Sequence, residues 1–91
     1  MAIGMYFAPE SMTAEQYDEI MRRLDQAGAG SPKGRLFHSC FGSGDKLMVF
    51  DVWESQADFE AFGPTMMPII TEMGVDPGQP DVMPMHHMVS S

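Results

Sequence analysis

Short segments of alternating apolar and polar residues near the two ends of the chain predict β-strands. Residues 2–7 alternate and end before Pro9, whose missing N–H cannot extend a hydrogen-bonded ladder. The side chains expected on their apolar side are Ile3, Met5 and Phe7. Residues 82–89 predict a final strand, and Pro84 within it favours a position at the edge of a sheet.

A segment near the N-terminus carries apolar side chains at helical spacing. It follows Thr13, which can cap a helix in a capping box with Gln16, and it ends at the glycine-rich loop of residues 28–34. The apolar stripe consists of Tyr17, Ile20, Met21 and Leu24. We therefore predict a helix that carries this stripe on one side and its polar residues on the others.

A second helical pattern follows Ser55, a plausible cap with Asp58 three residues later. The pattern continues to Gly74, but Pro64 and Pro68 interrupt it. Proline inside a helix removes a hydrogen bond and clashes with the preceding turn. The sequence therefore predicts two helical segments here.

Residues 35–53 predict two strands joined by a turn at residues 42–45, Gly-Ser-Gly-Asp. Alternation sorts their side chains onto two faces. One face is almost wholly apolar and carries Phe37, Ser39, Phe41, Met48, Phe50 and Val52. The other face carries Leu36, His38, Cys40, Leu47, Val49, Asp51 and Trp53.

The order strand, helix, hairpin, helix, strand predicts an α+β, ferredoxin-like βαββαβ fold for residues 1–91 as one domain. Both helices are expected on one face of a four-stranded antiparallel sheet. The other face would expose the apolar residues of the hairpin, and a second copy of the sheet is its natural cover. We therefore expect a homodimer that forms an α/β barrel, the alternative being a monomer with a more polar second face.

Charge excludes two classes of partner. Five basic residues stand against thirteen acidic ones, and a net charge of −8 repels nucleic-acid backbones and anionic membranes. Cys40 is the only cysteine, so no disulfide forms within the chain. The first residues resemble neither a signal peptide nor a membrane span, and we expect a cytoplasmic protein.

Methionine is unusually abundant, with eleven residues. Its side chain is flexible and polarizable, and it fills irregular apolar space without fixing one shape. Two interpretations follow: a soft core, or a pocket wall that adapts to a ligand.

Several segments resemble a known family. Residues 36–62, LFHSCFGSGDKLMVFDVWESQADFEAF, and the later PMHHMVS are similar to the dimeric α/β-barrel superfamily, above all to small antibiotic biosynthesis monooxygenase-like proteins. The most specific pieces are residues 34–38, residues 51–55 and His86. The resemblance implies the fold, dimerisation and oxygen insertion without a cofactor. The superfamily also includes isomerases, haem-binding proteins and members without assigned activity.

His38 and Asp51 are the main candidate catalytic residues. Pairing Phe41 with Lys46 places His38 opposite Val49 and diagonal to Asp51, within direct or water-mediated reach. A carboxylate beside an imidazole raises its basicity and fixes its tautomer, as a general base requires. The alternative is a buried pair that only satisfies its own hydrogen bonds.

Other residues complete the expected site. Trp53 could stack on a planar substrate, and Phe62 and Met67 would add to the apolar wall. His86, which closes the domain in the resembling proteins, or Tyr6 could hold a developing oxyanion. The alternatives are a core tryptophan, a core tyrosine and an edge-strand histidine.

We expect neither a metal nor an organic cofactor. The run of residues 83–88 contains thioether and imidazole groups that suit Cu(I), but His86 and His87 point to opposite faces of a strand. The chain has no glycine-rich phosphate motif, so a nucleotide or flavin is not indicated. Cys40, paired with Leu47 in this register, is expected to be a small buried hydrophobe.

The leading hypothesis is a cofactor-independent, monooxygenase-like enzyme. It would act on an enolisable or phenolic, largely apolar or aromatic small molecule in a pocket between sheet and helices. An isomerase or cyclase would use the same base. The rival class is a non-catalytic dimeric ligand-binding or stress-associated barrel.

Overall fold

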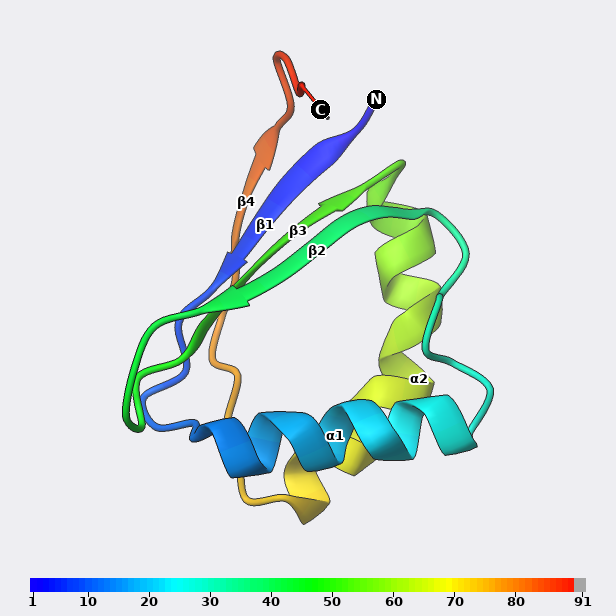
Figure 1. The fold of residues 1–91 in the computed structure, drawn as a ribbon. Helices are drawn as coiled ribbons and strands as arrows, with labels where there is room; N and C mark the ends of the chain where they lie inside the picture. Colours follow the sequence, from blue (N-terminus) through cyan, green and yellow to red (C-terminus); the bar gives the residue numbers. More distant parts are fainter. Residues whose placement is uncertain (90–91) are drawn as a thin grey trace.

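The elements follow the predicted order. The computed structural model describes residues 1–89. Its elements are β1 (Ile3–Phe7), α1 (Ala14–Gln26), β2 (Arg35–Phe41), β3 (Met48–Trp53), α2 (Gln56–Glu72) and β4 (Asp81–Pro84). The antiparallel sheet has the strand order β2-β3-β1-β4, and both helices lie on the same side of it (Figure 1). The predicted α+β, ferredoxin-like βαββαβ arrangement is confirmed.

Local sequence signals set the start of each helix. Thr13 caps α1: its hydroxyl accepts the Gln16 N–H, and the Gln16 side chain accepts the Thr13 N–H. Ser55 caps α2 by accepting the Asp58 N–H. Both predicted caps are therefore confirmed, and each satisfies an N–H that the helix itself leaves without a partner.

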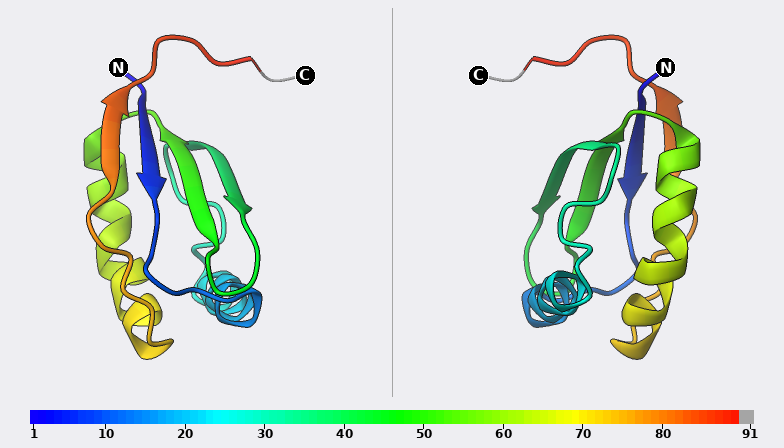
Figure 2. Two further views of the ribbon diagram at one scale, coloured as in Figure 1. Left: turned by 90° about the vertical axis from the view of Figure 1, so that its left-hand side faces the viewer. Right: turned by 90° about the vertical axis from the view of Figure 1, so that its right-hand side faces the viewer.

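The expected division of α2 into two segments is wrong. The helix runs without a break from Gln56 to Glu72, with Pro64 and Pro68 inside it, and it curves along its length (Figures 1 and 2). Each proline removes one N–H donor, which bends a helix without having to end it. Phe62 and Ile70, before and after the prolines, are both buried, so packing is continuous along the helix.

The hairpin register differs from the expected one by two residues. Phe41 lies opposite Met48, Cys40 opposite Val49, and His38 directly opposite Asp51. A shift of two residues keeps each side chain on its face, so the predicted sorting of the later hairpin residues holds. The turn is correspondingly longer than predicted and covers residues 42–47.

A β-bulge at the start of β2 changes the sorting of two residues. Arg35 pairs with Trp53 and Phe37 with Val52, so Leu36 is the extra residue between them. Leu36 was expected on the helix-facing face of the sheet, but it joins Phe37 on the opposite, open face. Arg35 turns instead to the helix-facing face.

The last strand is shorter than predicted. β4 ends at Pro84, which pairs with Ile3, the first residue of β1. Beyond this point β1 offers no partner strand, and only the Met85 N–H reaches the Ala2 carbonyl. The predicted edge position is confirmed because β4 ends the strand order. His86 lies after the strand.

The core lies between the helix-facing face and the two helices. It combines Met5, Phe7 and Trp53 of the sheet with helix residues Ile20, Leu24, Phe62 and Ile70. Within residues 1–89, no helix is long and apolar enough to cross a membrane.

The open face of the sheet is only partly as expected. Phe37 is 47% exposed and Phe41 about equally so, while Met48 and Phe50 are half-buried. Val52, also expected there as an exposed residue, is only 1% exposed. It borders a groove that Met85, Met88 and Val89 complete, so residues after β4 help to cover it.

Candidate active site

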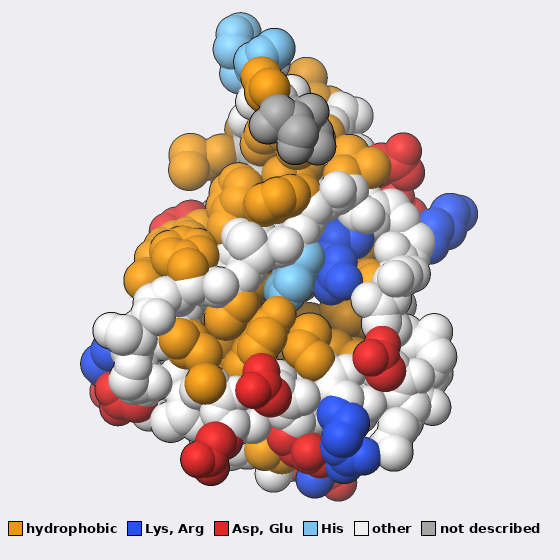
Figure 3. All heavy atoms as spheres, in the orientation of Figure 1, with side chains coloured by type: hydrophobic (Ala, Val, Ile, Leu, Met, Phe, Trp, Pro, Cys, Tyr) orange, Lys and Arg blue, Asp and Glu red, His pale blue; other side chains and the backbone are white. Residues whose placement is uncertain are grey.

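A pocket lies between the helix-facing face of the sheet, α1 and α2. Its cavity volume is about 70 Å³. Most of its wall is apolar, and its polar side chains are Tyr17, Arg35, His38 and Asp51. Figure 3 shows a hollow between the sheet and the helices, floored by hydrophobic side chains, with histidine and basic side chains at its upper rim. A mostly apolar cavity with a few convergent polar groups is typical of a ligand site.

His38 and Asp51 form a direct pair. They face each other across β2 and β3, with His38 Nδ1 2.5 Å from Asp51 Oδ1. Asp51 is only 6% exposed, and its other oxygen accepts a weak bond of 3.4 Å from Trp53 Nε1. An ionised carboxylate can only accept, so the proton of a neutral His38 ring lies on Nδ1. The second ring nitrogen, Nε2, is left as the basic one.

Tyr17 completes a part-buried chain of hydrogen bonds whose innermost member is Asp51. Its hydroxyl lies 2.6 Å from His38 Nε2, and the two rings are almost parallel. The pKa of Tyr17 is raised to about 12, mainly by burial and to a smaller extent by the charges of the Cys40 and Asp51 side chains, whereas Arg35 acts to lower it. The hydroxyl therefore stays protonated near neutral pH and donates to Nε2. We call Asp51, His38 and Tyr17 the buried network.

The buried network can move a proton between the pocket and His38. Tyr17 lines the pocket and its hydroxyl contacts the imidazole, so it can accept a proton from a ligand while passing its own to Nε2. Alternatively, a ligand can displace the hydroxyl and meet Nε2 directly. Either route leaves a positive imidazolium beside Asp51, whose carboxylate stabilises that charge.

Arg35 is the cation of the pocket. The bulge at Leu36 turns it toward the helices, where its guanidinium donates to the Gly30 carbonyl at 3.1 Å. Its side chain is half-buried. Its charge acts to lower the pKa of the Tyr17 hydroxyl, although the larger effect of burial raises that pKa overall.

Several predicted site residues lie elsewhere. Trp53 is 0% exposed and packs against Phe59 and Phe62, so it supports Asp51 from the core and does not form the pocket wall. Phe62 does line the pocket. Met67 is 42% exposed and lies outside it, because it falls on the solvent side of α2.

Tyr6 and His86 are not brought to the buried network. Tyr6 pairs with Phe50 on the open face, where it stacks on Phe41 and donates to the Met48 sulfur. The alternation of side chains along β1 explains this, because Met5 and Phe7 point to the helix-facing side. His86 is exposed beyond the end of β4 and does not line the pocket.

Sequence reasoning missed two functional candidates. The sequence pattern indicates Tyr17 only as part of an apolar stripe and gives Arg35 no role. The position of Tyr17 on the core-facing stripe was itself a signal, because a buried tyrosine hydroxyl needs a polar partner. No comparable signal existed for Arg35, whose direction depends on the bulge.

Cys40 and the histidines after β4 show no sign of a metal or nucleophile site. Burial, followed by the charge of Asp18, raises the pKa of the Cys40 thiol, which disfavours the reactive thiolate. In the part of the chain that the structure describes, no three His, Cys, Asp or Glu residues gather as metal ligands.

Comparisons with known proteins identify the fold. No family model matches the chain, and no curated protein matches it. Among solved structures, the structural-genomics protein YJCS has a TM-score of 0.67 at 9% identity, covering 94% of this chain and all of that one. A provisionally assigned antibiotic biosynthesis monooxygenase from Chloroflexus aurantiacus J-10-fl has a TM-score of 0.66 at 18% identity, covering 98% of each chain.

SnoaB, a cofactor-independent oxygenase from Streptomyces nogalater, has a TM-score of 0.62 at 14% identity, covering 99% of this chain and 96% of its own. The chain thus has the fold of antibiotic biosynthesis monooxygenase-like proteins, as the sequence resemblance implied. At such low identities the likeness extends to the fold alone.

Proposed function

We propose that this protein is a cofactor-independent, monooxygenase-like enzyme that acts on a small, apolar, enolisable or phenolic molecule. The observation that carries the proposal is the buried network: His38 lies between Asp51 Oδ1 at 2.5 Å and the Tyr17 hydroxyl at 2.6 Å, in the wall of an apolar pocket. This arrangement suits a general base, because one nitrogen is fixed by a carboxylate and the other faces a proton carrier.

The first step would remove a proton from the substrate. His38 takes it, directly or through Tyr17, and the substrate becomes an enolate or phenolate. Dioxygen then oxidises this electron-rich anion. For an activated CH₂ group the balance is R₂CH₂ + O₂ → R₂C=O + H₂O, so one oxygen atom enters the product and the other leaves as water. An isomerase or cyclase would share the first step only.

Methionine side chains support binding of a ligand larger than the present cavity. A pocket for a drug-sized ligand has roughly 300–1,000 Å³, well above the 70 Å³ here. Met12, Met21 and Met66 line the pocket, and unbranched thioether side chains change shape readily. We propose that these residues move aside on binding, which agrees with the interpretation of methionine as an adaptable wall.

We also propose that the open face joins two copies of the chain into a homodimer. Phe37 and Phe41 project from a sheet that has helices on its other side only. Burial of such a side chain contributes roughly 1.5–3 kcal/mol when complete. Phe37→Asp should therefore give monomers in light scattering. Met67 is a similarly exposed apolar residue on α2, and Met67→Asp should leave the dimer intact. A wild-type monomer at micromolar concentration would contradict this proposal.

The catalytic proposal is tested by oxygen uptake. The purified protein is incubated aerobically with a panel of quinols and polyphenols, and oxygen consumption and product mass are followed, with and without a chelator. We expect uptake with at least one compound, a product that has gained one oxygen atom, and no effect of the chelator. Binding without turnover across the panel would instead support the non-catalytic ligand-binding class.

A further inference from the structure

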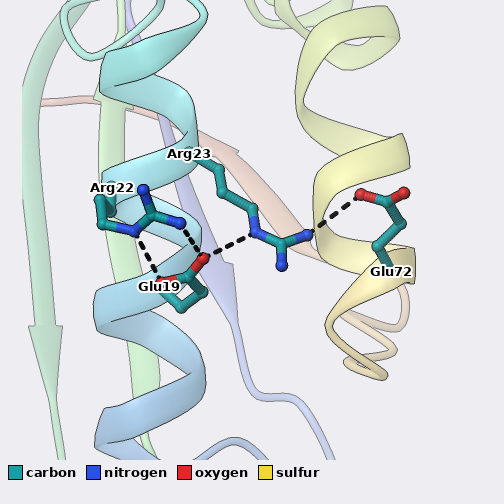
Figure 4. A network of polar contacts seen from close by, with 4 residues as sticks. All are labelled: Glu19, Arg22, Arg23 and Glu72. Atoms are coloured by element: carbon teal, nitrogen blue, oxygen red, sulfur yellow. Dashed lines mark hydrogen bonds and ion pairs between the residues drawn. The ribbon is translucent and has the colours of Figure 1, made fainter.

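The arginines of this acidic protein differ in whether they pair with carboxylates. Figure 4 shows Glu19 bonded to both Arg22 and Arg23, and Arg23 extending to Glu72 of α2. We call these four residues the surface network. The Lys46 ammonium donates to the Glu10 carbonyl at the surface.

Arg35 differs from the other two arginines. Among the described residues it has no carboxylate within ion-pair distance, and its only side-chain hydrogen bond goes to the Gly30 carbonyl. A guanidinium has five N–H donors in a planar fork that matches a carboxylate. Most of these donors are therefore available in a half-buried position at the pocket.

The backbone orients Arg35 into the pocket. Without the bulge at Leu36, alternation along β2 would place Arg35 with Phe37 on the open face. The preceding Gly34 has a φ of +86° and accepts the Glu54 N–H at 2.7 Å. A Cβ at Gly34 would collide with the Asp58 side chain. Bulges commonly redirect a side chain beside a functional site.

Asp51 is the one carboxylate among the described residues that line the pocket, and it is already engaged. The Asp51 carboxylate binds His38 and Trp53, so it faces these two groups rather than the guanidinium. The pocket therefore presents a cation on one part of its wall, a base on another and apolar side chains elsewhere.

We infer that the pocket recognises small apolar acids, with a ligand carboxylate bound by the Arg35 guanidinium and the apolar part lying toward Tyr17 and His38. This inference rests on the proposed substrate pocket and narrows its ligand class. A protein with a net charge of −8 repels anions at long range, so an acid needs a specific local cation to bind. Arg35 is that cation.

The test compares benzoate with benzamide, which has nearly the same shape without the charge. Binding is measured by chemical-shift titration of the ¹⁵N-labelled full chain. We expect benzoate to bind at least about tenfold more tightly, with shifts in β2 and α1. Arg35→Gln should weaken benzoate binding by about 10- to 100-fold, the usual range for a lost charge-assisted hydrogen bond, and leave benzamide unchanged.

Arg22→Gln is the matched control, because it removes the same charge from the surface network. It should leave benzoate binding unchanged, and Arg35→Lys should retain part of it. Equal binding of the two probes, no binding of either, or equal losses in Arg22→Gln and Arg35→Gln would overturn the inference. If Arg35→Gln does not fold, the inference is still tested by comparing benzoate with benzamide binding in the wild type and in Arg35→Lys.

The outcome is separable from that of the proposed enzyme. Benzoate-selective binding without oxygen uptake, on a panel extended to phenolic acids, would support the ligand class and reject the catalytic proposal. Turnover of a neutral phenol without any preference for benzoate would support the catalytic proposal and reject the ligand class.

Discussion

The buried network and the surface network consist of similar hydrogen-bonded polar groups, yet their surroundings differ. The buried network joins β2, β3 and α1, and its carboxylate is almost completely shielded from water. The surface network joins α1 to α2 with side chains that remain in contact with solvent. Water and salt screen exposed charges, whereas a buried polar group must keep its partner. Hydrogen bonds between similar polar groups thus make unequal contributions to stability and chemistry.

The largest expected effect is on turnover, from His38→Asn. The asparagine amide can still donate to Asp51, so the carboxylate keeps a partner while the basic Nε2 is lost. On any quinol or polyphenol that supports oxygen uptake, the rate should fall by about 10²- to 10⁴-fold, the usual contribution of a positioned base. His87→Asn, an exposed histidine after β4, should leave the rate unchanged. An undiminished rate in folded His38→Asn would remove His38 from the mechanism.

The next effect is on stability, from Asp51→Asn. This change weakens a charge-assisted hydrogen bond inside the protein and should lower the free energy of unfolding by about 1–3 kcal/mol, measured by urea denaturation. Because Asp51 and His38 act together, the double variant with His38→Asn should lose less than the sum of the single losses. Additive losses would mean that the two residues do not interact.

A smaller effect is expected at high pH from Tyr17. Folding raises the pKa of Tyr17 from its usual 10 to about 12, mainly by burial, so the folded state favours the neutral phenol. The resulting stability is fully present below pH 10 and is lost as pH rises to about 12. Wild type should therefore lose more stability than Tyr17→Phe across this window, in thermal unfolding monitored by circular dichroism. Parallel curves for the two proteins would contradict the hydroxyl's buried position.

The smallest effect is expected in the surface network from Glu19→Gln. Hydrogen bonds from Arg22 and then Arg23 lower the pKa of Glu19 to about 2. The stability linked to this shift is present above pH 4.5 and is lost as pH falls toward 2. The change in Tm at neutral pH should be smaller than for Asp51→Asn and should shrink further in 1 M salt, because exposed pairs are screened (a Debye length of about 3 Å). A decrease in Tm as large as that of Asp51→Asn would mean that the two networks contribute equally to stability.

Local signals in the sequence were sufficient for most of the fold. Alternation on both sides of the turn at residues 42–47 defined the hairpin, and the caps at Thr13 and Ser55 defined the helix starts. The hairpin register was not determined, since glycine-rich turns of different lengths fit the same pattern. The two-residue error was harmless to the faces because side chains alternate with a period of two.

The candidate site was only partly predictable. The pairing of His38 and Asp51 followed from their shared face, which survives the change of register. The packing of Trp53 against α2 and the direction of Arg35 depend on tertiary contacts and on one bulge, which leave no mark in residue pattern. The role of Tyr17 depends on the packing of α1 over the sheet, because its partner lies on another element.

The central claim is that His38 holds its proton on Nδ1 toward Asp51 and presents Nε2 to Tyr17. The ¹⁵N spectrum of the imidazole rings tests it most directly, recorded at a pH at which the rings are neutral. The His38 signals are assigned by their loss in His38→Asn. We predict the Nδ1–H tautomer, with a Nε2 shift that changes in Tyr17→Phe while the Nδ1 proton is retained. An Nε2–H tautomer, or a Nε2 shift insensitive to Tyr17→Phe, would contradict the account.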